Sequence, residues 1–320
     1  MKEFVVGIVM GVAGLAVTAS SLPAEDGVNP PFPDIAGPEM WIDGPLAVQV
    51  GGTKTVNDVA VDDQGRRIHV WSANSDSGDI FLRRWDAEGN PLEDPKSVNT
   101  GTAGAQDNPR VAVSANGSFL VIWQSREPDP VMGGGLFWLT RSRAYNADGD
   151  PLGSEQLVTT VIPTSLFENY ADVAALRTSD GSSGGYIVVW YSNSSAGSDL
   201  GTTIQGCLVD AGGVPGAQFQ VNSEDAPGQT FPAVTELADG GFLAAWTAGN
   251  NEVWGRRFNS AAGPIGSDFK ISTEYVTGKF EKDAAIGWDG TVAIVWADTD
   301  EQLPASDATE IRMGLLNADL

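Results

Sequence analysis

Phe119-Leu120-Val121-Ile122-Trp123 is a run of residues that favour β-structure, and it ends in tryptophan. The pattern recurs at Ile68–Trp71, Tyr186–Trp190, Phe242–Trp246 and Val292–Trp296, each time after a polar turn that contains glycine. Successive tryptophans lie 50 to 67 residues apart. A repeat of about 40–50 residues with four strands is typical of a β-propeller blade. The sequence therefore predicts an all-β, five-bladed β-propeller.

Four strands, here named A to D, are expected in each blade. Strand B is the run that closes with tryptophan. Strand A precedes it, at residues 58–61, 110–114, 172–176, 233–237 and 283–287. Strand C follows near residues 80–85, 136–145, 203–209, 252–258 and 310–316. Strand D is shorter, at residues 97–100, 156–159, 219–223 and 269–273.

A repeated turn joins strands C and D. Its copies are Asp86–Pro91, Asn146–Pro151, Asp210–Pro215 and Asn259–Pro264. Asn or Asp at the first position can hydrogen-bond to the backbone two residues on, and glycine accepts a positive φ. Proline at the end cannot lie within a central strand. Four copies make the turn a strong marker of where each blade reverses.

The two ends of the chain complement each other. The fifth blade stops after strand C, and the segment Ile42–Val50 contains Gly44-Pro45 followed by a short strand pattern. This is the second half of the same turn plus a strand D. We therefore expect residues 42–50 to complete the last blade and close the ring, which leaves no open sheet edge. The alternative is an open array within a larger assembly.

The N-terminal region is expected to lie outside the propeller. An apolar run from Phe4 to Val17 is too short to span a bilayer comfortably and precedes small residues, so residues 1–24 are predicted to be a signal peptide. An uncleaved anchor is the alternative. Residues 25–38 are a proline-rich linker, and residues 39–320 form the propeller. The blades are expected at about 56–100, 107–160, 170–223, 230–273, and 281–320 with 42–50.

The formal net charge of −24 limits the partners that the protein can have. An acidic surface repels nucleic acid and anionic membranes, so neither is expected to bind. After cleavage of the signal peptide no membrane span remains, and we expect a secreted, periplasmic or cell-surface location. The single cysteine, Cys207, excludes an intramolecular disulfide, and the single histidine, His69, argues against a His-dependent catalytic triad or a zinc site with several histidines.

The blades resemble those of secreted bacterial β-propeller proteins with degenerate sialidase-like, or Asp-box, repeats. The resemblance rests on the strand that ends Val-Val-Trp and on the turns around Glu88-Gly89 and Asp148-Gly149, which lie where such propellers carry the Asp-box. It covers residues 42–320 and is specific for blades, without the serine and tryptophan of the box itself. The resemblance implies a propeller in a secreted protein and no particular activity.

One position near the start of strand A differs between blades and is the main candidate site. It is occupied by Asp58, Arg110, Asp172, Ala233 and Asp283. Equivalent positions in five blades form a ring, so three carboxylates and one arginine should converge at the mouth of the channel. The arrangement is similar to that of five-bladed furanosidases and arabinanases, in which three central carboxylates act as acid, base and orienter. Carboxylates held close together shift one another's pKa. The alternative is that these residues cap turns or seal the channel.

Two further sets of residues are candidates on the same face, which carries the B–C and D–A loops. Tyr170 and Phe231 lie in predicted D–A loops, where they could stack on sugar rings or fill gaps between blades. Asp298, Asp300 and Glu301 are a candidate Ca²⁺ site, although a solvated acidic loop explains them better. We expect no cofactor, with Ca²⁺ as the alternative. The opposite face, made of short glycine turns, is expected to be structural.

These observations favour a secreted or envelope-associated binding module, whose partner is a glycan or an envelope protein. Two alternatives remain open. One is a glycoside hydrolase that uses the carboxylates at the channel mouth, and the other is a structural surface subunit. The sequence does not decide whether the protein is an enzyme, and it favours a protein without catalytic activity.

Overall fold

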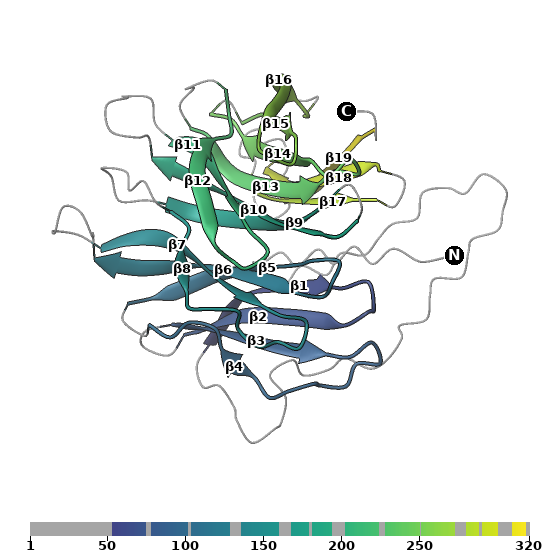
Figure 1. Ribbon diagram of the computed structural model, residues 1–320. Coiled ribbons are helices and arrows are strands. Elements are labelled where there is room, and N and C mark those ends of the chain that lie inside the picture. The colour runs from purple at the N-terminus through teal and green to yellow at the C-terminus, as the bar shows by residue number, and fades with distance from the viewer. Residues whose placement is uncertain are drawn as a thin grey trace.

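In the part of the chain that it describes, the computed structural model contains five antiparallel sheets and no helix, which confirms the five-bladed β-propeller (Figure 1). The described residues are 53–74, 78–101, 104–128, 136–159, 168–178, 181–193, 202–223, 228–249, 251–272, 280–287, 290–299 and 309–317. None of this part is a helix long and apolar enough to cross a membrane.

Each sheet is a simple up-and-down arrangement of consecutive strands. Blade 1 contains β1 (Thr53–Val61), β2 (Arg67–Asn74), β3 (Asp79–Trp85) and β4 (Lys96–Ser97). Blade 2 contains β5 (Gln106–Val113), β6 (Phe119–Pro128), β7 (Leu136–Tyr145) and β8 (Gln156–Leu157). Blade 3 contains β9 (Glu168–Arg177), β10 (Ser183–Asn193), β11 (Thr202–Val209) and β12 (Pro215–Gln220). Blade 4 contains β13 (Thr230–Glu236), β14 (Phe242–Thr247), β15 (Val253–Phe258) and β16 (Pro264–Lys270). Blade 5 contains β17 (Phe280–Ile286), β18 (Val292–Thr299) and β19 (Thr309–Leu316).

The first strand of every blade lies toward the middle of the molecule (Figure 1), and β4, β8, β12 and β16 form the opposite edges of their sheets. Neighbouring first strands contact one another in order, from β1 to β5, β9, β13 and β17. They are called inner strands below. Because each inner strand is a sheet edge, half of its backbone N–H and C=O groups point away from its only strand partner. The propeller therefore brings five strand edges together around its axis.

The strands that contain the five tryptophans do not stop there, contrary to the sequence-based expectation. Trp123 lies in the middle of β6, which continues to Pro128, and Trp190 is followed in β10 by Tyr191, Ser192 and Asn193. The β6–β7 pair is extended in the same way, from Phe119 opposite Tyr145 to Pro128 opposite Leu136. Tryptophan marks the buried middle of the strand, where two blades meet, and polar residues continue the ladder beyond it.

Four of the five blade tryptophans pack against a neighbouring blade. All five are buried. Trp123 shares a cluster with Ile80 and Leu82 of blade 1, and Trp190 shares one with Leu120 and Ile122 of blade 2. The pattern continues with Trp246 against blade 3 and Trp296 against blade 4. Each of these four tryptophans therefore covers the face of the preceding blade.

The repeated turn forms as its residues predict. Asn146 Oδ1 accepts hydrogen bonds from the N–H groups of Asp148, at 3.0 Å, and Asp150, at 2.8 Å. Gly149 has a φ of 79°, which a glycine adopts without cost. In blade 4 a residue with a side chain, Ala262, holds the same conformation at a φ of 61°. The turn is therefore specified by its first residue and by the positive φ, and glycine is preferred rather than required.

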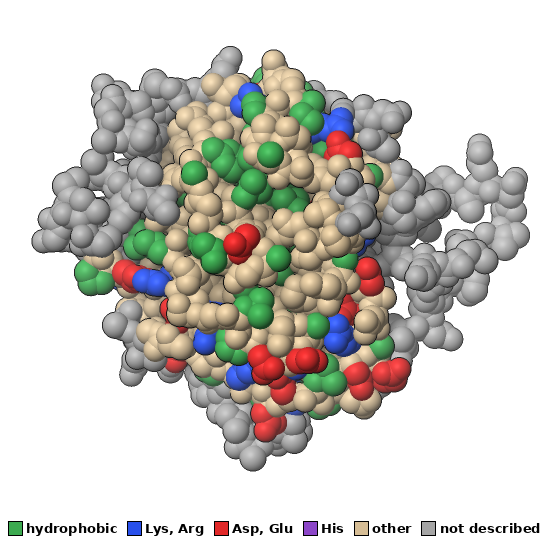
Figure 2. Space-filling model, viewed as in Figure 1, with side chains coloured by type: hydrophobic (Ala, Val, Ile, Leu, Met, Phe, Trp, Pro, Cys, Tyr) green, Lys and Arg blue, Asp and Glu red, His purple; other side chains and the backbone are tan. Residues whose placement is uncertain are grey.

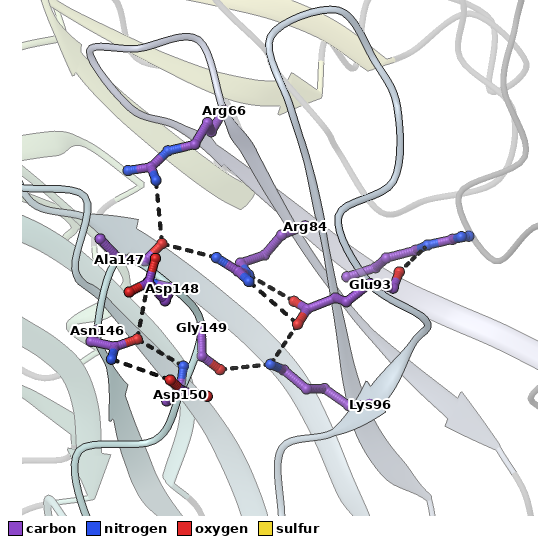
Figure 3. A network of polar contacts seen from close by, with 10 residues as sticks. Arg66, Arg84, Glu93, Lys96, Asn146, Ala147, Asp148, Gly149 and Asp150 are labelled. Atoms are coloured by element: carbon purple, nitrogen blue, oxygen red, sulfur yellow. Dashed lines mark hydrogen bonds and ion pairs between the residues drawn. The ribbon is translucent and has the colours of Figure 1, made fainter.

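This turn also links one blade to the next, which its sequence did not reveal (Figure 3). In blade 2, the Ala147 carbonyl group accepts hydrogen bonds from Arg84, at 2.9 Å, and from Arg66, at 3.3 Å, both in blade 1. The Gly149 carbonyl group accepts a hydrogen bond of 2.6 Å from Lys96. Glu93 pairs with both Arg84 and Lys96 at 2.7 Å. The turn thus presents its carbonyl groups to three cations of the preceding blade.

The outer strands differ from the predicted strand D. In blades 3 and 4 they begin at the proline of the turn, at Pro215 and Pro264, several residues before the predicted start. In blades 1 and 2 the regular pairing is limited to two residues. The fifth sheet has three strands among the described residues. The predicted signal peptide, linker and closing segment 42–50 all lie outside the described residues.

Replacement of an interblade tryptophan is expected to cost much of the stability. Trp246→Ala removes a side chain that is 2% exposed and leaves a cavity between blades 3 and 4. The expected loss in the free energy of unfolding is about 3–5 kcal/mol, measured by urea denaturation. Leu152→Ala, at an exposed turn position, is the control and should change stability by less than about 0.5 kcal/mol. A small effect at Trp246 would contradict the packing described above.

Candidate functional site

The five residues at the variable position of the inner strands are structurally equivalent. Each of its five residues is paired with the residue that immediately precedes the tryptophan of the blade. The pairs are Asp58–Val70, Arg110–Ile122, Asp172–Val189, Ala233–Ala245 and Asp283–Val295. We call these five inner-strand residues the ring. Three carboxylates and one guanidinium thus occupy equivalent positions around the axis.

The ring lies deeper than the sequence suggested. Each inner strand begins several residues before its ring residue, so Asp58, Arg110 and Asp172 are inside their strands and not at their starts. Strand A was predicted too short because a β-bulge interrupts its alternation. The register shifts between Asp107 and Arg110, and again between Thr230 and Ala233. The ring therefore lines the interior of the propeller below its mouth.

Three of the bulges hold a residue other than glycine at a positive φ. These residues are Asn108, Tyr170 and Phe231, with φ values of 50°, 55° and 49°. Each lies two residues before the ring residue of its blade. A left-handed backbone is tolerated by asparagine, but it is strained for a bulky aromatic residue and costs about 1–3 kcal/mol. Such strain persists where the surroundings require it, and it clusters at functional sites.

Two of the ring carboxylates connect neighbouring blades through the backbone. Asp58 Oδ2 in blade 1 accepts a hydrogen bond of 2.9 Å from the N–H group of Val111 in blade 2. Asp172 Oδ2 in blade 3 accepts one of 2.7 Å from the N–H group of Val234 in blade 4. These N–H groups belong to inner strand edges and face away from the sheet. An aspartate of the preceding blade therefore satisfies a donor that no strand can reach.

The other two charged ring residues are less tightly held. Asp283 Oδ1 accepts a hydrogen bond of 2.8 Å from the N–H group of Ala284, and its side chain is exposed. Within the described residues, its second oxygen accepts no hydrogen bond. Arg110 donates to the Pro109 carbonyl group at 3.1 Å and is half-buried. Asp283 and Arg110 thus retain hydrogen-bonding capacity for a ligand.

The ring residues influence one another's protonation. Burial raises the pKa of Asp172 to about 7, the negative charge of Asp283 adds to this, and Arg110 opposes it. Burial also raises the pKa of Asp58, against the effect of Arg110. The Asp283 side chain is accessible to solvent, but the surrounding protein still desolvates it; this desolvation raises its pKa, and the charge of Asp58 adds to the effect. The charged ring residues of four blades are therefore close enough to affect one another's pKa.

An aromatic cluster lies beside the ring on blades 3 and 4. The ring centroids of Tyr170 and Phe231 are 5.0 Å apart, and Tyr191 lies 6.2 Å from Tyr170 and 6.4 Å from Phe231. All three side chains are half-buried. The Lys282 ammonium lies 5.8 Å from the Phe231 ring and donates a hydrogen bond to Thr247. We call Tyr170, Tyr191 and Phe231 the aromatic cluster.

Sequence reasoning identified Tyr170 and Phe231 but placed them in loops, whereas they lie in strands β9 and β13, at the bulges. It missed Tyr191 and Lys282. The signal for Tyr191 was present, because the residue after the blade tryptophan is Ser72, Gln124, Thr247 or Ala297 in the other blades. Tyrosine at this position is an exception. No sequence signal pointed to Lys282, because this residue of blade 5 contacts blade 4 only in the folded protein.

The predicted calcium site lies mostly outside the described residues. Asp298 lies in strand β18, where its backbone pairs with that of Glu310, and not in a loop as predicted. Asp300 and Glu301 lie outside the described residues. Among the described side chains, no group of three or more His, Cys, Asp or Glu residues is placed to hold a metal ion.

The face made of short glycine turns is not featureless. A pocket of about 610 Å³ lies between the turns of blades 3, 4 and 5, and Arg177, Glu236 and Asp239 are among its lining residues. Arg177 lies 3.6 Å from Glu236 and 3.7 Å from Asp63 of blade 1. Both ion pairs of the Arg177 side chain are long, but Glu236 also accepts a short hydrogen bond from the Arg177 N–H group. Burial raises the pKa of Glu236. This pocket was not expected from the sequence.

Charge is distributed unevenly over the outer surface. On the face seen in Figure 2, acidic and basic side chains lie close together over blades 1 and 2. The ion pairs Asp62–Arg66, at 2.6 Å, and Glu93–Arg84, at 2.7 Å, belong to this part of the protein. Hydrophobic side chains form scattered small patches elsewhere (Figure 2). Eight Lys and Arg side chains of the described residues form ion pairs with Asp or Glu.

The link between Asp172 and Val234 predicts a contrast between two substitutions. Asp172→Ala leaves the Val234 N–H group without an acceptor and should lower the free energy of unfolding by about 1–3 kcal/mol. Asp172→Asn keeps an oxygen in place and should cost less. Asp94→Ala, at an exposed site, is the control. Equal losses for Asp172→Ala and Asp172→Asn in urea denaturation at pH 7.5 would contradict the link.

The raised pKa of Asp172 also predicts a pH dependence. Its carboxyl group holds a proton more tightly in the folded than in the unfolded state, so its contribution to stability falls as the pH rises from about 4 to about 7. The pKa of His69 is lowered to about 4 by burial, which acts in the opposite direction. Because both proteins contain His69, its contribution cancels in the difference in stability between the original protein and the Asp172→Asn variant. From pH 4.5 to 7.5 the original protein should lose stability relative to the Asp172→Asn variant; a constant difference would be contrary evidence.

The chain shares its fold with proteins of known structure. No protein-family model matches it, and no curated protein matches it. It is similar to the crystal structure of a protein of unknown function from Dyadobacter fermentans DSM 18053, with 13% identity, 83% of this chain and 79% of that chain covered, and a TM-score of 0.57. It is also similar to polysaccharide lyase Uly1, with 12% identity, 83% and 58% coverage, and a TM-score of 0.50. The α-L-arabinanase of Penicillium chrysogenum, complexed with arabinobiose, matches at 10% identity, 83% and 94% coverage, and a TM-score of 0.48. Identities this low show a shared fold and nothing about activity.

Proposed function

We propose that the protein is a secreted or envelope-associated binding module that holds a glycan where the inner strands carry their bulges. The aromatic cluster is the observation that carries this proposal. Tyr170 and Phe231 keep strained backbone conformations, and their rings remain half-buried instead of entering the core. Aromatic faces bind the apolar faces of sugar rings, and nearby polar groups fix the orientation of a ligand. Arg110 and Asp283 supply such groups.

The hydrogen bonds of the ring support binding in preference to catalysis. Asp58 accepts N–H groups with both oxygens, from Val59 at 2.8 Å and from Val111 at 2.9 Å. A carboxylate engaged in this way is held in place but has little freedom to exchange a proton with a substrate. Asp172 is likewise bound to Val234. Two of the three acids therefore have a structural task that explains their presence.

A glycoside hydrolase is the second candidate, and one observation favours it. Such enzymes use two carboxyl groups, of which one is protonated at working pH. Asp172, with a pKa raised to about 7, and the exposed Asp283 are electrostatically coupled and fit this division. In this alternative Asp172 is the acid and Asp283 the base or nucleophile. An envelope protein as partner, or a structural surface subunit, is the outcome expected if no glycan binds.

The binding proposal predicts a loss of affinity when the aromatic cluster is reduced. On a glycan array, the protein should bind a defined set of glycans. Tyr191→Ala should then weaken binding to that set by about tenfold, which corresponds to ~1.4 kcal/mol. Val214→Ala, at an exposed site on a C–D turn, is the control and should bind normally. A well-folded protein that binds no glycan, or a Tyr191→Ala variant with unchanged affinity, would count against the proposal.

A screen with aryl-furanoside and aryl-pyranoside substrates separates the hydrolase from the binding module. Turnover by the original protein that falls by orders of magnitude in Asp283→Asn would establish the enzyme. Because Asp283 makes no link to another blade within the described residues, this variant should fold normally. Absence of turnover in a protein that binds a glycan, with weaker binding in Asp283→Asn, would support the binding module alone.

A further inference from the structure

The pocket between the glycine turns of blades 3, 4 and 5 lies on the other side of the ring from the aromatic cluster. Arg177 lines this pocket and is the last residue of β9, whereas Tyr170 and Asp172 lie in the first half of that strand. At about 3.3 Å per residue, the step from Asp172 to Arg177 corresponds to roughly 16 Å. The pocket is therefore separate from both the ring and the aromatic cluster.

Contacts of Arg177 place this pocket close to the axis of the propeller. Arg177 of blade 3 lies 3.7 Å from Asp63 of blade 1, although blade 2 lies between these blades in the order of contacts from β1 to β5 and β9. Two turns from blades that are not neighbours can meet in this way only near the axis. The side chains of Arg177 and Asp63 are 51% and 66% exposed. A ligand can therefore reach Arg177 from solvent at this end of the channel.

The turn of blade 4 holds the end of β9 in place. Gly240 has a φ of 80°, and a Cβ atom added to it would lie 2.9 Å from the Arg177 carbonyl oxygen, so the turn can approach β9 this closely because it has no side chain there. On the other side of the same peptide chain, Glu236 accepts a hydrogen bond from the Arg177 N–H group. Backbone contacts thus fix the positions from which Arg177 and Glu236 extend.

Two arginine–acid pairs involve lining residues of this pocket, and they differ in how far their hydrogen bonds are satisfied. Asp239 accepts with both oxygens, from the Gly241 N–H group at 3.0 Å and from Arg257 at 2.6 Å. In the other pair, Arg177 Nε lies 3.6 Å from Glu236 Oε2, which is too far for a hydrogen bond. Among the described residues, the Arg177 guanidinium group donates no hydrogen bond and Glu236 Oε2 accepts none. Arg177 and Glu236 are called the open pair below.

We propose that the open pair binds adjacent hydroxyl groups of a neutral sugar residue, at a second site that is independent of the aromatic cluster. A hydroxyl group both donates and accepts hydrogen bonds. One hydroxyl group of the sugar donates to Glu236 Oε2, and its neighbour accepts from the Arg177 guanidinium group. The sugar thereby supplies the hydrogen bonds that the two side chains do not make with each other.

The charges around the open pair favour a neutral ligand over a charged one. An anion that approaches Arg177 also meets Glu236, Asp239 and Asp63, and a cation that approaches Glu236 meets the Arg177 guanidinium group 3.6 Å away. Burial raises the pKa of Glu236, the charge of Asp63 adds to this, and Arg177 opposes it. A hydroxyl group that donates to Glu236 stabilises the carboxylate without bringing a further charge into the pocket.

The size and lining of the pocket fit a sugar residue. Its volume of about 610 Å³ is within the range of small-molecule sites, about 300–1,000 Å³. Leu237 and Ile286 are also lining residues and can contact the C–H groups of a pyranose or furanose ring. Among the described lining residues there is no aromatic side chain on which a sugar could stack. We therefore expect weak binding, with a dissociation constant of about 1 mM.

Saturation-transfer NMR on the full-length chain tests this site. The probes are D-glucose, D-galactose and L-arabinose, and every protein carries Tyr191→Ala so that the aromatic cluster contributes little. At least one of these sugars should bind. Added Arg177→Met or Glu236→Gln should weaken its binding by about tenfold or more, because each removes one half of the open pair. Arg126→Met, at an exposed arginine of blade 2, is the matched control and should leave binding unchanged.

Matched charged sugars test the ligand class. The uronate and the amino-sugar forms of the sugar that binds differ from it by one group and one charge, and both should bind several-fold more weakly than the neutral form. Tighter binding of either charged form, lost in Arg177→Met, would show that the pocket selects a charged ligand and would overturn the assignment.

Two other results would overturn the site itself. One is binding that is unchanged in folded Arg177→Met or Glu236→Gln protein. The other is absence of binding of every neutral sugar to folded protein with Arg177 and Glu236 intact. If Arg177→Met does not fold, Glu236→Gln decides, since it keeps an acceptor for the Arg177 N–H group. None of these results bears on glycan binding by the aromatic cluster, which is measured in protein that retains Tyr191.

Discussion

Packing of one blade against the next is the interaction on which the rest of this structure depends. A twisted sheet without helices has two faces to bury, and only another sheet can cover them. In this protein a tryptophan from each of blades 2 to 5 covers the preceding blade. Polar contacts follow the same direction, since the turn at Asn146–Pro151 binds cations of blade 1. The blades are therefore stable only as neighbours within the ring.

The same packing creates the candidate site. Burial of both sheet faces brings five inner strands to the axis with their edges unpaired, and Asp58 and Asp172 satisfy N–H groups of the next blade. Bulges above the ring turn Tyr170 and Phe231 toward each other and toward Tyr191. The ring residue serves as a structural link in blades 1 and 3. In blades 2 and 5 the same position makes no such link, and it holds Arg110 and Asp283. Residues that can bind a ligand therefore occupy the ring positions whose side chains do not accept a backbone N–H group of the next blade.

Sequence patterns located strands wherever alternation was regular. The third strand of blade 2 was predicted at residues 136–145 and is found there. The inner strands were predicted too short, because a bulge at Asn108, Tyr170 or Phe231 breaks the alternation of period two. The ring was predicted from one position near the start of strand A, and the register confirms that its members are equivalent. Tyr191 was missed because an aromatic residue after tryptophan resembles an ordinary continuation of the strand.

The sequence by itself determined the architecture: five repeats, their turns and the buried tryptophans are local patterns that need no knowledge of distant contacts. Only the tertiary structure decided how the charged and aromatic residues act together. The pKa of Asp172 depends on burial and on Asp283 and Arg110, which come from three blades, and Lys282 meets Phe231 only across a blade boundary. Desolvation and electrostatic interactions between blades depend on distances that the repeat pattern does not encode. For that physical reason the fold could be read from the residues, and the chemistry of the ring required their positions in space.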